Sequence, residues 1–172
     1  MVFIATLINR NLVISLLGLQ PASFPNEPWT IITNIFVHAS FWHIFANMLT
    51  LFFFGSYLLR LVGETKFLIV YFVGGIIGNV MFILLGPPFV TAVGASGAVF
   101  ALGGALAVMR PKLKVIIFPI PIPLDLWIAV IGGFLVISFL PYIAWQAHLG
   151  GLVAGLIAGY LFRKRERGVF WR

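Results

Sequence analysis

The chain has 172 residues, of which 62% are hydrophobic and only 9% are charged, and its mean hydropathy is +1.12. A soluble domain carries roughly 25% charged residues, so this composition excludes a soluble enzyme and indicates an integral membrane protein. Because the chain contains no cysteine, disulfides, a thiol nucleophile and a cysteine-ligated metal are also excluded.

The length allows five or six helices of about 20 residues, and we expect an all-α bundle of six transmembrane helices in a single domain over 1–172. In chain order, the predicted helices lie near residues 1–17, 40–60, 66–85, 96–110, 124–139 and 144–163. The third and sixth of these are long uncharged segments, as a membrane span requires. Asn9, Arg10 and Asn11 interrupt the first, so that helix is either short and broken or the chain begins partway into it.

Two connections are marked by prolines. The long loop before the second helix carries Pro21, Pro25, Pro28 and Trp29, and we predict that it packs on the outer edge of the bilayer. Residues 118–123 have proline at every second position, which excludes a helix interior. This second stretch is therefore predicted to be an extended connector on the inner side.

Most of the basic residues that give the net charge of +7 lie in the gaps between the apolar runs. Basic residues occupy alternate gaps between the apolar runs and the C-terminal tail: Arg60 and Lys66; Arg110, Lys112 and Lys114; and Arg163, Lys164, Arg165, Arg167 and Arg172. The gaps near 18–37, 86–95 and 138–144 contain none. This positive-inside pattern predicts a multi-pass protein with a cytoplasmic C-terminus, expected in the plasma membrane, and no nucleic-acid partner.

The fourth helix is predicted to be too short to cross the membrane. From Ser96 to Met109 it would measure about 21 Å, whereas the hydrocarbon core is about 30 Å thick. Ser96 should therefore lie in a first turn that begins below the outer surface. Residues 86–95 would descend to it as irregular chain, which is tolerated at this depth only inside protein or beside a watery cavity.

Three more polar side chains are predicted at the same depth. His148 lies about one turn from the outer start of the sixth helix, and His43 and Asn47 are spaced i, i+4 on one face of the second. Taken singly, such residues usually serve packing or interhelical hydrogen bonding, and the string around Ser96 departs from a G-x-S-x-G elbow. Taken together, polar groups at one level in the bilayer indicate a functional site.

The chemistry of this group favours a serine hydrolase that opens to the outer side. Ser96 needs a base to accept its proton, and His148 lies on a separate helix from the other histidines. The Ser96 N–H at a helix N-terminus, the Asn47 amide and the His43 ring are candidate donors to an oxyanion. None of the four acidic residues is predicted near His148, so we expect a Ser–His dyad with the imidazole packed on Phe100.

Small residues should allow the fourth and sixth helices to approach. Gly151 and Gly155 recur at four-residue spacing on the sixth helix, and Gly97 and Ala101 match them on the fourth. Ordinary packing without catalysis predicts the same glycines. Metal binding by the histidines at 38, 43 and 148 lacks carboxylate or thiol ligands nearby, and we predict neither a metal nor a cofactor.

Three strings resemble the rhomboid family of intramembrane serine proteases: HASFWHIFAN at 38–47, GASG at 94–97 and AHLGG at 147–151. The resemblance implies a six-helix core with Ser96 as nucleophile and His148 as general base. It also implies oxyanion donors at His43 and Asn47. Supporting residues would be His38, Gly94, Gly97 and Phe100, the last replacing a tyrosine of some relatives.

The same resemblance implies how the protein would work in the membrane. Transmembrane proteins would be the substrates, the loop before the second helix would be a membrane-embedded hairpin, and the fifth helix with residues 138–144 would form a gate and cap. No oligomeric state is predicted. Two alternatives are a non-catalytic protein that binds transmembrane clients and a small transporter or channel. The latter would need ionisable residues along a path, and the inner halves of the helices lack them.

Overall fold

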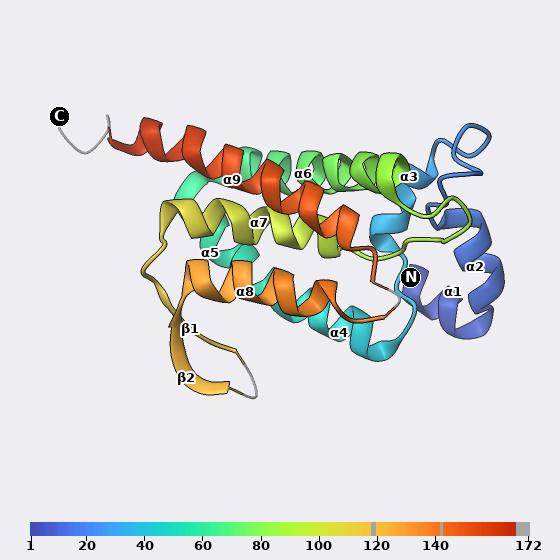
Figure 1. Ribbon diagram of the computed structural model, residues 1–172, viewed down its shortest axis with the longest axis horizontal. Helices are drawn as coiled ribbons and strands as arrows, with labels where there is room; N and C mark the ends of the chain where they lie inside the picture. Colours follow the sequence, from blue (N-terminus) through green and yellow to red (C-terminus); the bar gives the residue numbers. More distant parts are fainter. Residues whose placement is uncertain (118–119, 142, 168–172) are drawn as a thin grey trace.

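The computed structural model describes residues 1–117, 120–141 and 143–167 as a helix bundle with one small β-hairpin (Figure 1). The elements are α1 (Val2–Ile8), α2 (Arg10–Leu17), α3 (Thr30–Thr33), the 3-10 helix η1 (Asn34–Phe36), α4 (Phe41–Thr50), the π-helical segment η2 (Leu51–Gly55), α5 (Ser56–Val62), α6 (Glu64–Leu85), α7 (Ser96–Met109), β1 (Lys114–Ile117), β2 (Ile120–Asp125), α8 (Leu126–Ser138) and α9 (Trp145–Arg167). Three parts of the predicted domain lie outside the described residues. They are positions 118–119 of the connector, position 142 of the predicted cap and the last five residues, 168–172.

Within the described part of the chain, three helices are long and apolar enough to cross a membrane. They are Phe41–Val62, which joins α4, η2 and α5, then Glu64–Leu85, and Trp145–Arg163 of α9. The helices α7 and α8 are apolar but shorter, as the sequence predicts for the segment that begins at Ser96. The protein is therefore a multi-pass membrane protein with a mostly helical fold.

Of the two alternatives for the first helix, the structure shows the interruption, since α1 and α2 meet at Asn9. The chain leaves helical geometry at Asn9, whose side chain accepts a hydrogen bond from the Leu12 N–H at 3.1 Å and so caps α2. The following loop contains α3 and η1, which the sequence analysis did not predict. Trp29 donates its indole N–H to the Leu16 carbonyl at 3.0 Å, which ties this loop to the end of α2.

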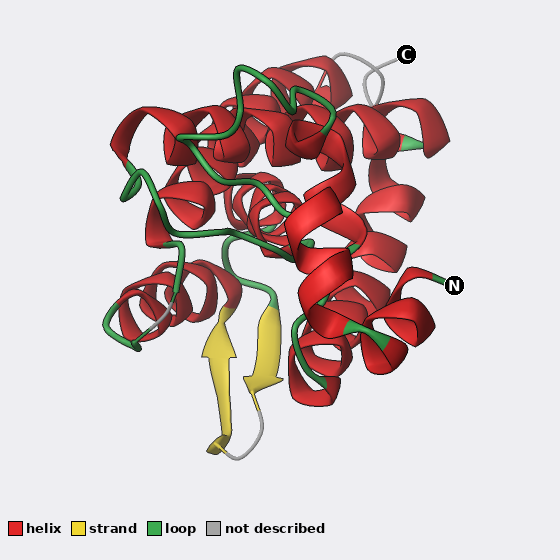
Figure 2. Ribbon diagram, turned by 90° about the vertical axis from the view of Figure 1, so that its right-hand side faces the viewer, coloured by secondary structure: helices red, strands yellow, loops and turns green. Residues whose placement is uncertain are grey.

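The expectation of an all-α fold was wrong in one place. The strands β1 and β2 form an antiparallel hairpin, with Lys114 paired to Asp125 and Val115 to Leu124. Figure 2 shows it projecting from the helices. Prolines block a helix there, and β-branched neighbours favour extended chain, so the predicted extended connector folds back on itself and pairs.

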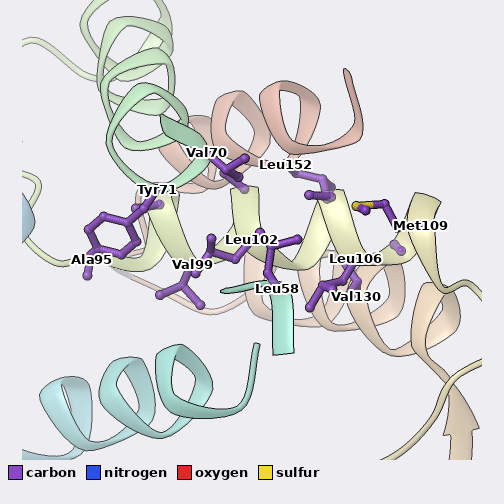
Figure 3. Close-up of a cluster of buried hydrophobic side chains, with 14 of the residues drawn as sticks. Leu58, Val70, Tyr71, Ala95, Val99, Leu102, Leu106, Met109, Val130 and Leu152 are labelled. Carbon is purple, nitrogen blue, oxygen red and sulfur yellow. The ribbon is translucent and has the colours of Figure 1, made fainter. Parts of the chain in front are cut away.

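The core is built around α7, which Figure 3 shows surrounded by other helices. Its sequence is apolar on all sides, and such a helix is stable where it is buried on all sides. Leu58, Val70, Val130 and Leu152 reach it from α5, α6, α8 and α9 and join one buried cluster. Ser96 thus starts the most enclosed helix of the molecule.

Glycines bring α9 against α7 and α6. A Cβ added at Gly151 would overlap the carbonyl of Gly97, and one at Gly155 would overlap the carbonyl of Ala101. On the neighbouring face, a Cβ at Gly150 would lie 2.8 Å from the Cα of Gly78. The backbones are in direct contact, which is how small residues allow membrane helices to pack.

Candidate active site

The structure brings Ser96 and His148 together. The Ser96 Oγ lies 2.7 Å from the His148 Nε2, although the two residues are 52 positions apart in the chain. Ser96 is the first residue of α7 and is half-buried, whereas His148 lies in the first turn of α9 and is 5% exposed. The contact of Gly97 with Gly151, one turn along, sets the short distance between the two helices.

The backbone before Ser96 is held in a glycine-only conformation. Gly94 has φ +119°, a region that residues with a Cβ rarely adopt, and its N–H donates to the Asn34 carbonyl at 2.9 Å. The first bond along α7 runs from the Val99 N–H to the Ala95 carbonyl at 2.9 Å. The N–H of Ser96 therefore belongs to the first turn, where amides have no partner within the helix and the helix dipole is positive.

The helix α4 brings His43 to the same place. Ser40 caps this helix, accepting the His43 N–H at 3.2 Å. A Cβ added at Gly94 would lie 2.6 Å from the His43 Nε2, so the ring rests on the backbone two residues before Ser96. Ser96 of α7, His148 of α9 and the His43 ring of α4 therefore lie in one region of the structure.

Asn47 lies one turn further along the same face of α4 and is 6% exposed. Its Nδ2 donates to the His43 carbonyl at 2.8 Å. An amide nitrogen carries two hydrogens, so this bond uses one of two donors. The remaining N–H is the one that an oxyanion could accept.

His38 is buried beside this group, at 3% exposure, and its ring stands edge-on to His43 with centroids 5.1 Å apart. Neither of its ring nitrogens makes a hydrogen bond of good geometry. Burial lowers the pKa of His38 from 6.5 to about 4, with a further lowering from His43 and a smaller opposing effect from the Phe36 backbone. The ring is therefore neutral at neutral pH and fixes the orientation of His43 by packing.

The imidazole of His148 is held by an aromatic ring. Phe100 lies one turn after Ser96, and its ring is tilted by 34° to that of His148 with centroids 4.8 Å apart. The His148 Nδ1 is buried and has no hydrogen-bond partner among the described residues. Asp125 is engaged elsewhere, at 2.7 Å from Lys114. This geometry fits a dyad without an orienting acid.

The sequence analysis missed one polar pair near the site. Asn34 of η1 and Asn79 of α6 exchange two side-chain hydrogen bonds, and both are buried. The sequence does contain an indication of this pair, because Asn79 is a polar residue inside an otherwise apolar span, as Asn47 is. Among the residues the structure describes, no group of three histidine or acidic side chains is arranged to hold a metal ion.

The fold and the site define a membrane-embedded helical protein with a serine and a histidine in contact at the start of a short, enclosed helix. The sequence matches the rhomboid domain over residues 25–165, a range that contains every residue of the site. The chain belongs to the rhomboid family.

Relatives in several organisms are similar over most of this chain. It is 30% identical to Rhomboid protein 1, mitochondrial, of Saccharomyces cerevisiae over 158 residues, covering 78% of this chain and 42% of that protein. It is 34% identical to the putative rhomboid protease YdcA of Bacillus subtilis (82% and 71% covered) and 34% identical to the rhomboid protease GlpG of Haemophilus influenzae (83% and 73%). Because relatives of this chain include proteins named as mitochondrial, its location in the plasma membrane stays a prediction.

Proposed function

We propose that the protein is an intramembrane serine endopeptidase that cleaves transmembrane proteins, with Ser96 as nucleophile and His148 as general base. The observation that carries the proposal is the 2.7 Å approach of the Ser96 Oγ to the His148 Nε2. Hydrogen-bond reach between a nucleophile and its base is the first geometric requirement of such a site. Membership of the rhomboid family, in which several relatives are named proteases, supports it.

The reaction uses these atoms in two steps. The Ser96 Oγ attacks the scissile carbonyl carbon while its proton moves to the His148 Nε2, and the carbonyl oxygen becomes an oxyanion. His148 then gives the proton to the leaving amine as the C–N bond breaks, leaving an acyl group on Ser96. A water molecule, deprotonated by His148, attacks this ester; the acid product leaves and the proton returns to Ser96.

The proposed oxyanion donors come from two helices. The Ser96 N–H in the first turn of α7 supplies one, and the His43 ring and the second amide hydrogen of Asn47 supply the others from α4. Donors that are fixed before the reaction stabilise the developing charge without reorganising, which is often the largest single contribution to catalysis. Burial of Asn47 and packing of His43 between Gly94 and His38 support this preorganisation.

His148 would become an imidazolium without a carboxylate partner. For its Nε2 to accept from Ser96, the proton of the neutral ring must be on Nδ1. The face of Phe100, 4.8 Å away between centroids, both orients this ring and attracts the positive charge that forms on it.

The wider arrangement is part of the proposal. Residues 1–172 would form one domain with six membrane-crossing segments, with α1 and α2 forming the broken first segment, the C-terminus in the cytoplasm and the site open to the opposite side. The distribution of basic loops supports this orientation. The helix α8 and the chain that follows it would form the gate and cap for substrate, with exposed Phe139 and Leu140 at its end.

The test is cleavage of a single-span substrate by the full chain in proteoliposomes. Ser96→Ala and His148→Ala should each abolish cleavage, and Ser15→Ala, at an exposed serine that hydrogen-bonds only the Leu12 carbonyl in the described structure, should not. A fluorophosphonate should label the wild type and not Ser96→Ala. Cleavage that survives either substitution at the dyad would overturn the proposal, and co-purification of uncut substrate with the wild type would favour a client-binding protein.

A further inference from the structure

The first turn of α9, which carries His148, begins without a capping side chain. None of residues 140–144 is a serine, threonine, aspartate or asparagine, the residues that usually cap the start of a helix. The backbone bond from the His148 N–H to the Ala144 carbonyl is long, at 3.4 Å. Because helix ends that are held only by their own backbone open easily, this turn depends on contacts with other helices.

Gln146 supplies such a contact. Its side chain is buried, and its Nε2 donates to the Leu85 carbonyl at 3.2 Å. Leu85 is the last residue of α6, and the carbonyls in the last turn of a helix have no partner within that helix. The bond therefore satisfies one of these carbonyls and joins the start of α9 to a helix long enough to span the membrane.

The first turn of α9 is held between α6 and α7. Residues two apart on a helix are separated by about 200°, so Gln146 points to α6 and His148 to the opposite side, toward α7. The carbonyl oxygen of Ala147 packs between them: a Cβ at Gly78 of α6 would overlap it, and one at Gly97 of α7 would lie 3.2 Å from it. Figure 1 shows the start of α9 beside the end of α6 and the start of α7.

Gln146 also lies where the chain enters the bundle. Phe139 and Leu140 are exposed and Trp145 is 40% exposed, whereas residues 146–148 are buried. Among the described residues that follow α8, Gln146 is the first that is buried. Motion of the preceding segment, the proposed cap, would therefore reach the dyad through the turn that Gln146 anchors.

We propose that Gln146 is a positioning residue for His148. Its bond to α6 keeps the first turn of α9 where the His148 Nε2 meets the Ser96 Oγ, at 2.7 Å. A displacement of about 1 Å at a reacting group can lower a rate by about 100-fold, so an anchor of this kind has a measurable effect. The inference rests on the proposed function, because Gln146 acts through the proposed base and is not itself a catalytic residue.

The first test is cleavage of a single-span substrate by the full chain in proteoliposomes. Gln146→Met keeps a side chain of similar length but cannot donate to the Leu85 carbonyl. We expect kcat to fall about tenfold with little change in KM, because the loss of one hydrogen bond corresponds to about that factor in a rate. The matched control is Gln20→Met, since Gln20 also donates its Nε2 to a backbone carbonyl, that of Phe89, at 3.0 Å. It should keep the kcat of the wild type.

The second test observes the dyad directly and needs no substrate. The ¹⁵N NMR signal of the His148 Nε2 is measured in the wild type and in Ser96→Ala, and the difference between them reports the hydrogen bond with Ser96. The signal of Gln146→Met should lie between these two, and that of Gln20→Met should coincide with the wild type. Gln146→Leu, which also lacks the donor, should behave as Gln146→Met does, so the result does not depend on one substitution.

A wild-type kcat in Gln146→Met would overturn the positioning role, even where Ser96→Ala is inactive. A lower kcat with an unmoved Nε2 signal would overturn it as well, because Gln146 would then act elsewhere. Equal losses in Gln20→Met would show a general effect of removing a glutamine bond and would have the same consequence. Cleavage by Ser96→Ala would instead contradict the proposed function, and the nitrogen signal would still decide whether Gln146 positions His148.

Discussion

Asn34 of η1 and Asn79 of α6 exchange two amide hydrogen bonds, at 3.0 and 2.8 Å, between the loop before α4 and a helix long enough to span the membrane. The Asn79 Nδ2 also donates to the Ile31 carbonyl at 2.7 Å. Because the Asn34 carbonyl accepts the N–H of Gly94, this pair connects α6 to the chain that leads into Ser96. Residues of η1 and α6 therefore help to hold the start of α7 in place.

Replacing Asn79 should loosen this connection. Asn79→Ala leaves the buried amide of Asn34 without its partner, and we expect a loss of about 2 kcal/mol in the free energy of unfolding. Reversible unfolding of the wild type and of Asn79→Ala in mixed micelles measures this loss. In a double-mutant cycle, Asn34→Ala should add little once Asn79 is gone, because both substitutions break the same bonds. Additive losses would show that the two residues act separately.

The proposed donor role of Asn47 predicts a defect in the chemical step. Asn47→Ala should lower kcat by about 10²–10³-fold, as loss of an oxyanion donor does elsewhere, with a smaller change in KM. Thr50→Ala is the matched control, since Thr50 on the same helix also bonds the carbonyl four residues back, at 2.8 Å. Measuring kcat and KM for both variants in proteoliposomes tests this prediction. An Asn47→Ala enzyme with normal kcat would remove Asn47 from the oxyanion site.

The contact between α7 and α9 predicts a contrast between two glycines. A Cβ at Gly155 would overlap the Ala101 carbonyl, and Gly155→Ala should cost about 1–3 kcal/mol as the helices are forced apart. At Gly133 on α8 a Cβ meets nothing within 4 Å, so Gly133→Ala should be neutral or stabilising by roughly 0.5–1 kcal/mol. Unfolding measurements on both variants test this. Equal effects would contradict the packing argument.

Some of this structure could be predicted because local sequence determines it. The length of the apolar run that ends at Arg110 predicts a short α7 that begins at Ser96, and the start of the last apolar run places His148 in the first turn of α9. The glycine spacing then indicates which faces meet. These features depend on helix geometry, which is regular, whereas the contact between Ser96 and His148 also depends on how α7 and α9 pack.

Other features depend on contacts between distant segments. The prolines at 118–123 exclude a helix, but pairing of β1 with β2 depends on a register that composition alone does not reveal. The helices α3 and η1 are too short to be stable alone, and they are held by Asn79 and other tertiary contacts. Sequence patterns therefore predicted the long helices and missed the short elements between them.

The buried histidine at position 38 predicts how stability depends on pH. In the unfolded chain His38 binds a proton near pH 6.5, whereas in the folded protein burial lowers its pKa to about 4. Between these values the unfolded state binds more protons, so the free energy of unfolding falls as pH falls from 6.5 to 4.

The variant His38→Phe tests this, because it keeps a ring beside His43 but cannot titrate. Its stability should therefore decline less steeply over that window than the wild type's, as measured by unfolding at pH 6.5, 5.5 and 4.5. Identical slopes for the two proteins would show that His38 is not protonated on unfolding, and that other groups cause the acid sensitivity.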